Sequence, residues 1–341
     1  MTTPPWLGLD IGGANLKAAH TSGVARSVAF ALWKLPERLP ETLAHLAAAM
    51  PRADHVAVTM TGELCDCFRT KAEGVRTILQ AVLDVFLERT VRVWTTDGTF
   101  EDPFSVILRP ETAAAANWLA LATLGARLAP KGPAILVDIG STTADLIPLR
   151  DGVPVPRGRT DTDRLRTGEL VYAGVSRTPV CALATTLPHR GEPTGLAAEL
   201  FATTRDVYLT LGDLDPAPDD NETADGRPVT REAARDRLSR MVGADRDGFS
   251  EADALAFARE ADATLMARLI EAAERACLAA TGARPHAAIV SGSGEFLSRR
   301  LAERILAPGG RIVSLREQWG QNASSAACAH ALAVLAAEEP R

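Results

Sequence analysis

The strongest constraint on the fold is a short pattern that occurs twice in this chain of 341 residues. Residues 7–19 read LGLDIGGANLKAA, and residues 136–149 read LVDIGSTTADLIPL. Each copy is an apolar strand, an Asp-Ile-Gly triplet, a few small or hydroxylated residues, and a second apolar strand. A single copy is weak evidence, because Asp-Gly is also a common hairpin turn. Two copies, each at the start of a candidate domain, favour a duplicated unit over two unrelated hairpins.

The repeated loops have the residue types of a phosphate and magnesium site. Glycine lets the backbone approach a phosphate closely, and the N–H groups of such a turn form an anion-binding concavity. A carboxylate at the strand end can hold Mg²⁺ directly or through water. We therefore expect Asp10 and Asp138 to be catalytic metal ligands and Lys17 to be a catalytic cation. Asp145 is either a further metal ligand or a charge at the edge of the turn. The expected diphosphate- or nucleotide-binding residues of the two loops are Gly12, Gly13, Asn15, Gly140, Ser141, Thr142 and Thr143.

Strands and helices alternate along the rest of the chain, which favours an α/β fold. Residues 150–181 are rich in Arg, Gly and Thr and are expected to form an irregular, ligand-facing region. The helix breakers Pro-Lys-Gly-Pro at 130–133 suggest a boundary between a domain of residues 1–130 and a domain of residues 131–341. In this scheme the last helix can pack back on the first domain. The principal helices are expected at 40–50, 70–89, 110–128, 251–280, 294–306 and 322–338.

A third glycine-rich turn follows the apolar strand of residues 287–290 and precedes a helix. It contains Gly292, Ser293 and Gly294, which we include among the candidate nucleotide- or diphosphate-binding residues. A plain strand-to-helix turn capped by serine explains the same residues equally well.

The composition is that of a soluble globular protein, with 46% hydrophobic and 23% charged residues. The net charge of -6 argues against nucleic acid as the main partner. No uncharged apolar run reaches the length of a membrane span, and the N-terminal segment has no signal-peptide pattern. Five scattered cysteines fit a reducing cytoplasm, where we expect the protein to reside. A homodimer is compatible with the sequence.

The three glycine-containing turns, in this order, resemble the acetate kinase/sugar kinase/Hsp70/actin superfamily. Further segments resemble hydantoinase A/oxoprolinase-related proteins linked to one-carbon transfer on methanopterin-type carriers. The resemblance covers nearly the whole chain and implies a two-domain actin-like ATPase (ribonuclease H-like) fold with an interdomain cleft. The further segments are VTMTGELCDCFRTKAEGV (58–75), RTGELVYAGVSRTPV (166–180), ELFATTRDVYLTLGDL (199–214) and TADGRPVTREAARDRLSRMVGAD (223–245).

Within this group, the resemblance implies a Mg²⁺-dependent transferase of methanofuran-type coenzyme biosynthesis. Such an enzyme joins an (aminomethyl)furanmethanol diphosphate to the phenol of γ-glutamyltyramine, or of tyrosine or tyramine, and releases pyrophosphate. ATP is less favoured, because Gly-Ser-Gly at 292–294 departs from the Gly-Gly pair of nucleotide-binding members of the superfamily. Two alternatives stay open: an ATP-dependent small-molecule kinase or hydantoinase/oxoprolinase-like hydrolase, and a non-catalytic nucleotide-binding regulator.

Other candidate residues lie near strand ends, where α/β sheets bind ligands. Glu63 follows the strand of residues 55–60 and is a candidate general base. Lys71 can hold diphosphate or a glutamyl carboxylate, although a solvated charge at a helix start explains it too. Cys65 and Cys67 lack a second Cys/His pair, so no zinc site is expected. Three further residues either contact substrate or belong to a solvated loop, namely Arg166, Glu169 and Tyr172.

Overall fold

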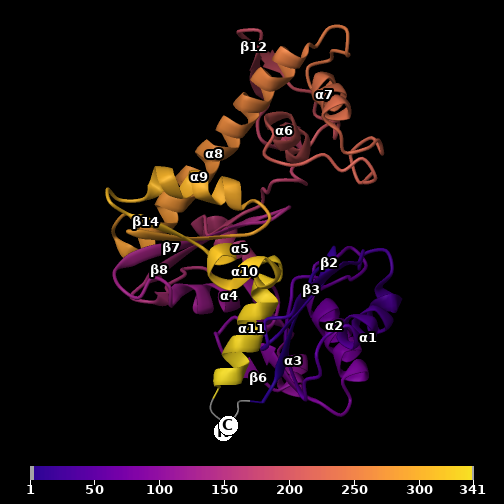
Figure 1. Ribbon diagram of the computed structural model, residues 1–341, viewed down its shortest axis with the longest axis vertical. Helices are drawn as coiled ribbons and strands as arrows, with labels where there is room; N and C mark the ends of the chain where they lie inside the picture. The colour runs from indigo at the N-terminus through magenta and orange to yellow at the C-terminus, as the bar shows by residue number, and fades with distance from the viewer. Residues whose placement is uncertain (1–3, 340–341) are drawn as a thin grey trace.

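The computed structural model describes residues 4–339, which contain two mixed β-sheets of the same topology (Figure 1). In the first sheet, three antiparallel strands are followed by two strands parallel to the central β1 and a short edge strand. The order is β3 (Ala25–Ala29), β2 (Asn15–His20), β1 (Trp6–Ile11), β4 (His55–Met60), β5 (Thr90–Trp94) and β6 (Phe100–Glu101).

The second sheet repeats this plan from its central strand β7. The order is β10 (Leu170–Val171), β8 (Ala144–Arg150), β7 (Pro133–Ile139), β13 (Ala287–Ser291) and β14 (Arg311–Ser314), with β9 (Val153–Pro154) on β8. The two copies of the sequence repeat are therefore the β1–β2 and β7–β8 hairpins. The duplication predicted from the sequence is confirmed, and the fold is that of the actin-like ATPases.

Helices cover both faces of the first sheet, which explains why β1 is buried along its whole length. Residues Leu7, Leu9 and Ile11 point to one face, where they pack on α1 (Leu39–Ala48) and α2 (Lys71–Val85). Gly8 points to the other face, against α11 (Ala327–Glu338). A Cβ atom on Gly8 would lie 2.0 Å from the carbonyl oxygen of Ala329, so only glycine allows this close approach.

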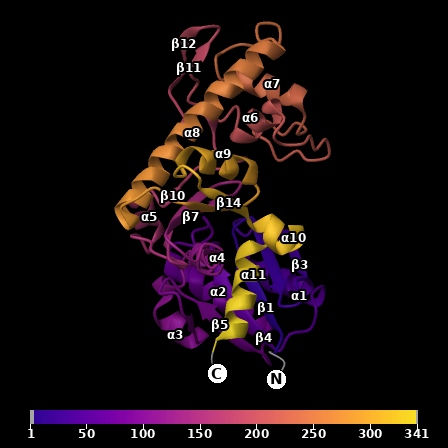
Figure 2. The ribbon, with the colours of Figure 1, turned by 60° about the vertical axis from the view of Figure 1, so that its left-hand side comes forward.

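The second sheet is also covered on both faces. The helices α8 (Glu251–Thr281) and α9 (Glu295–Ile305) pack on one face through Leu265, Leu269 and Leu297. The other face packs on α4 (Asn117–Ala126), which also contacts α11. One apolar core thus joins the two sheets through α4 and α11, and Figure 2 shows these helices beside each other.

This arrangement bears on the expected domain boundary at residue 130. The helix α4 precedes the boundary but packs on the second sheet, whereas α11 follows it but packs on the first sheet. The division of the chain into residues 1–130 and 131–341 stays a prediction.

A small subdomain lies beyond the second sheet, at the top of Figure 1. It comprises β11 (Thr186–His189), β12 (Glu192–Gly195), α6 (Thr204–Leu211), α7 (Arg231–Arg240) and the first part of α8. The fully buried Arg237 side chain pairs with Asp206 at 2.6 Å and with Asp225 at 3.0 Å. Charged residues in the family-like segments 199–214 and 223–245 therefore hold this subdomain together.

Several element boundaries differ from the sequence expectations. The helix expected at 110–128 begins only at Asn117, because Pro110–Thr112 form a separate 3₁₀ turn and Ala115 has a positive φ of 49°. The helix expected at 322–338 is two helices, α10 (Leu315–Ser325) and α11, which meet at Ala326. The irregular region 150–181 contains α5 (Asp161–Thr167), and the short α3 (Pro103–Leu108) was not expected. No helix within residues 4–339 has the length and apolar character needed to cross a bilayer.

Candidate active site

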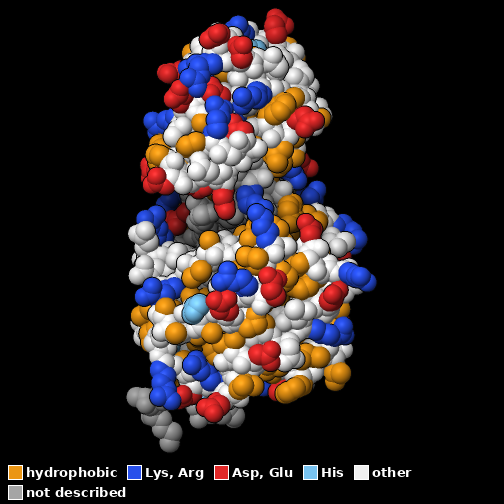
Figure 3. All heavy atoms as spheres, turned by 90° about the vertical axis from the view of Figure 1, so that its right-hand side faces the viewer, with side chains coloured by type: hydrophobic (Ala, Val, Ile, Leu, Met, Phe, Trp, Pro, Cys, Tyr) orange, Lys and Arg blue, Asp and Glu red, His pale blue; other side chains and the backbone are white. Residues whose placement is uncertain are grey.

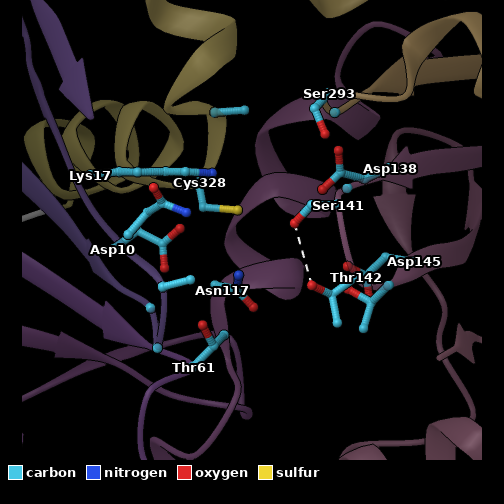
Figure 4. A pocket seen from close by; sticks show the side chains of 18 of the residues that line it. Asp10, Lys17, Thr61, Asn117, Asp138, Ser141, Thr142, Asp145, Ser293 and Cys328 are labelled. Carbon is cyan, nitrogen blue, oxygen red and sulfur yellow. Dashed lines mark hydrogen bonds between the residues drawn. The ribbon is translucent and has the colours of Figure 1, made fainter. Parts of the chain in front are cut away.

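A cavity of about 1150 Å³ lies between the two sheets and is lined by both Asp-Ile-Gly loops. Figure 3 shows the molecular surface hollowed at this level. In Figure 4, Asp10 and Lys17 lie on one side of the cavity, and Asp138 and Ser141 lie on the other. The duplicated hairpins thus present the same kind of loop to a shared space.

The two loops have matching turns. In the first loop, the Gly12 N–H donates to the Asn15 carbonyl at 3.0 Å. In the second, the Gly140 N–H donates to the Thr143 carbonyl at 2.8 Å. This turn brings small and hydroxylated residues to the cavity wall, where backbone and side-chain donors can meet an anion.

Asp10 and Lys17 are neighbours across the β1–β2 pair. The Asp10 side chain is buried, and its Oδ1 atom has no hydrogen-bond partner within residues 4–339. Burial raises the pKa of Asp10 against the opposing effect of Lys17. Burial acts to lower the pKa of Lys17, but the negative charges of Asp10 and Asp138 contribute to a net rise. Lys17 is therefore positively charged in the cavity at neutral pH.

Asp138 faces the cavity from the end of β7. Burial, followed by the charge of Asp145, raises the pKa of Asp138 to about 6. No group of three His, Cys, Asp or Glu side chains within residues 4–339 is placed to form a metal cage. Mg²⁺ binds instead through one or two carboxylates, several waters and substrate phosphates. An unpartnered Asp10 oxygen with Asp138 opposite fits that mode of binding.

Asp145 is held by a buried arginine. The Arg164 side chain, which is 2% exposed, forms an ion pair with Asp145 and lies 3.6 Å from Asp161. Its guanidinium carbon is 4.1 Å from the centroid of the Trp118 ring. Because its charge is already balanced by Arg164, Asp145 fits a supporting role better than that of a metal ligand.

This ion pair gives a prediction for stability. Arg164→Met leaves the Asp145 carboxylate buried without its partner, so the free energy of unfolding should fall by about 3 kcal/mol in urea titrations. Adding Asp145→Asn should recover part of the loss. The matched control is Arg166→Met on the same helix, which should change stability by less than about 0.5 kcal/mol because Arg166 is exposed. Equal losses for the two arginine variants would contradict the assignment.

Glu63 lies in the cavity wall after β4. Its side chain is 1% exposed, and its Oε2 atom has no hydrogen-bond partner within residues 4–339. Burial raises the pKa of Glu63 to about 7, while Lys71 lowers it and Asp161 raises it further. The Lys71 and Asp161 side chains themselves lie 3.6 Å apart. A carboxyl with a pKa near 7 is suited to proton transfer at neutral pH.

Most of the residues predicted to form the site line the cavity, including Tyr172, Gly292 and Ser293. Lys71 and Gly294 lie outside the lining. Two expected substrate contacts, Arg166 and Glu169, also lie outside the lining, and their contact with substrate stays a prediction. The Arg166 side chain is 73% exposed and pairs with Asp163 at 3.1 Å. The buried Glu169 carboxylate instead accepts hydrogen bonds from backbone and side-chain donors of its own loop, namely Arg157 N, Gly158 N and Thr167 Oγ1.

Comparison with known proteins identifies the family. The hydantoinase/oxoprolinase family model matches residues 54–338, which is most of the chain. The chain belongs to the hydantoinase/oxoprolinase family.

The chain is similar to two curated proteins that have the same name, (4-{4-[2-(γ-L-glutamylamino)ethyl]phenoxymethyl}furan-2-yl)methanamine synthase. The protein of Methanocaldococcus jannaschii is 33% identical over 333 residues, which cover 96% of each chain. The protein of Methanococcus vannielii is 29% identical over 206 residues, or 60% of this chain and 91% of the relative. The likeness to the first relative therefore extends over nearly the whole chain.

Among solved structures, the nucleotide-free structure of an acetone carboxylase is similar in fold. It superposes with a TM-score of 0.53 at 12% sequence identity, over 98% of this chain and 70% of that one. This likeness supports the two-sheet architecture of the hydantoinase/oxoprolinase family member and carries no information about its substrate.

Sequence reasoning missed several residues that line the cavity of this family member. Arg166 was predicted to contact the ligand, and Arg164 was missed. Two positions that are two residues apart on a helix, as these are, point in directions that differ by about 200°. The helical spacing would have separated the two arginines if α5 had been expected. No comparable local signal marks the other missed residues, which are Trp33, Asn117, Arg177, Arg316 and Cys328.

Proposed function

We propose that this enzyme forms an aryl furfuryl ether, joining (aminomethyl)furanmethanol diphosphate to the phenol of γ-glutamyltyramine and releasing pyrophosphate. The observation that carries the proposal is the match of 33% identity over 96% of both chains to the synthase of Methanocaldococcus jannaschii. The compound in the name of that relative contains a phenoxymethyl link to a furan. The location proposed for the reaction is the cytoplasm. The five free cysteine thiols support this location, because a reducing compartment keeps thiols from forming disulfides.

The cavity supports this chemistry because it offers two different environments. The Asp-Ile-Gly loops and Lys17 present donors and positive charge for a diphosphate. Mg²⁺ held by Asp10 and Asp138 would neutralise the diphosphate and stabilise it as a leaving group. The other environment contains Glu63, whose pKa of about 7 suits it to accept the phenol proton.

The bond changes follow from these positions. The bond between the furfuryl carbon and the diphosphate oxygen breaks, and its electron pair stays on the diphosphate. The furan ring stabilises the positive charge that develops on the carbon. The phenol oxygen forms the new bond to this carbon and loses its proton to Glu63. The residues of the chain mainly position the two substrates and stabilise the leaving group.

The central test is an incubation of the protein with the furan diphosphate, γ-glutamyltyramine and Mg²⁺. We expect stoichiometric ether and pyrophosphate by mass spectrometry and phosphate assay, and no product in excess EDTA. ATP in place of the furan diphosphate should give no ADP above background. ATP hydrolysis without any ether would overturn the proposal.

A further inference from the structure

The segment after β10 is joined closely to the second Asp-Ile-Gly loop. Three successive N–H groups donate to this loop: Val175 to the Gly140 carbonyl at 3.0 Å, and Ser176 and Arg177 to the Ser141 carbonyl at 3.1 and 2.9 Å. A Cβ atom on Gly174 would lie 2.5 Å from the Gly140 oxygen, so glycine is required for this contact. The backbone of Arg177 is therefore fixed relative to the loop.

A second segment is joined in the same way to the first loop. The Phe30 N–H donates to the Ala14 carbonyl at 3.0 Å, and the Leu32 N–H donates to the Gly13 carbonyl at 2.9 Å. The next residue is Trp33, whose side chain is 37% exposed and lines the cavity. Each of the two loops thus carries an attached segment that ends in a large side chain at the cavity.

These two side chains meet across the cavity. The guanidinium carbon of Arg177 is 5.7 Å from the centroid of the Trp33 ring, within the range of a cation–π contact. A second observation also places Arg177 near the first sheet. Burial raises the pKa of the Cys65 thiol to about 11, and the positive charge of Arg177 acts in the opposite direction. Arg177 therefore links the two halves of the cavity.

Among residues 4–339, the Arg177 guanidinium has no ion-pair partner. Arg164 and Lys17 already face carboxylates. No carboxylate within residues 4–339 lies within 4.0 Å of the Arg177 guanidinium. Arg316 on α10 also lines the cavity without such a partner, but no backbone hydrogen bond of the described chain joins α10 to either loop. A planar fork of N–H donors with no partner suits two oxygens of a phosphate group.

We propose that Arg177 binds the diphosphate across the mouth of the cavity and, supported by the ring of Trp33, bridges the two Asp-Ile-Gly loops. The identity of the ligand as a diphosphate rests on the proposed function. Arg177 then donates to non-bridging oxygens of the diphosphate. When the carbon–oxygen bond breaks and its electron pair passes to the diphosphate, Arg177 balances part of the additional negative charge. Pyrophosphate, as the released product, binds to the same donors.

The test uses inorganic pyrophosphate with excess Mg²⁺ and the full chain, so it does not depend on turnover. By titration calorimetry, Arg177→Ala should raise the Kd about ten- to hundredfold, the effect of losing charge-assisted hydrogen bonds. Arg177→Lys keeps the charge without the fork and should fall between the wild type and Arg177→Ala. The matched control is Arg259→Ala, an exposed arginine on α8 outside the cavity, which should bind as the wild type does. Measured without ligand, all variants should have the same melting temperature as the wild type.

Trp33 provides a second measurement. Its indole emission should change on pyrophosphate addition in the wild type, and the change should be absent in Trp33→Phe and reduced in Arg177→Ala. Wild-type affinity in Arg177→Ala, or no pyrophosphate binding by the wild type, would overturn the inference. Pyrophosphate binding that requires Arg177, without ether formation, would refute only the proposed function. Ether formation with an unchanged KM and kcat in Arg177→Ala would refute only the role of Arg177.

Discussion

Asp138→Asn should lower kcat/KM for ether formation by about a thousandfold while making the protein more stable. The loss follows because asparagine keeps the shape of the side chain but removes a carboxylate that we assign to Mg²⁺ and, through it, to the leaving diphosphate. The gain follows from electrostatics, because the Asp138 carboxylate is charged beside Asp145 in a buried setting that raises its pKa to about 6.

The sign of the stability effect depends on pH. Between its ordinary pKa of 3.8 and the folded value of about 6, Asp138 binds more protons in the folded chain than in the unfolded one. Stability therefore falls as pH rises through this window, and the full penalty is present above it. At pH 8 in EDTA, Asp138→Asn should raise the free energy of unfolding by about 1–2 kcal/mol, and at pH 3 it should have little effect.

Kinetics and urea unfolding of one preparation test both parts. Asp151→Asn, in the turn at the far end of the same hairpin, is a control outside the cavity for activity. A variant that loses activity because it unfolds would show lower stability, which is the opposite of the expected result. Retained activity in Asp138→Asn would remove this residue from the metal–diphosphate role.

The sequence was most informative where a local pattern determines backbone geometry. The Asp-Ile-Gly repeat correctly predicted two hairpins with equivalent turns, and the family segments correctly predicted a two-sheet fold. Both features depend on short-range rules, namely apolar strands and glycine-containing turns. The sequence allowed for a last helix that packs back on the first domain, as α11 does, but it did not indicate that α4 would pack on the second sheet. That pairing depends on contacts between residues far apart in the chain.

Individual side chains of the site were harder to predict for the same reason. Arg166 and Glu169 stand in a polar segment in which every residue could face a ligand. Their places were decided by the α5 helix and by backbone donors at Arg157 and Gly158. Arg177 and Trp33 lie in segments far apart in sequence, and only the hydrogen bonds of each segment to its loop bring them together. Such pairs have no periodicity or spacing that a single sequence can reveal.

Glu63→Gln is expected to remove the general base and lower kcat/KM roughly 100- to 10,000-fold at pH 8. In the wild type, kcat/KM should rise about tenfold per pH unit up to about pH 7 and then level off, because Glu63 must be ionised to accept the phenol proton. The variant should lose this dependence. At pH 8 it should also be more stable by roughly 2–3 kcal/mol, since glutamine removes a charge buried at considerable cost.

Two neighbouring residues allow the assignment to be tested without removing the base. Asp161→Asn removes a negative charge that raises the pKa of Glu63, so the midpoint of the pH–rate profile should move to lower pH. Lys71→Met removes a positive charge that lowers this pKa, so the midpoint should move to higher pH. A purely structural role for either residue would change the rate at all pH values without moving the midpoint. Opposite displacements in these two variants, combined with a flat profile in Glu63→Gln, would identify Glu63 as the group that titrates, whereas an unmoved midpoint in both would assign the titration to another group.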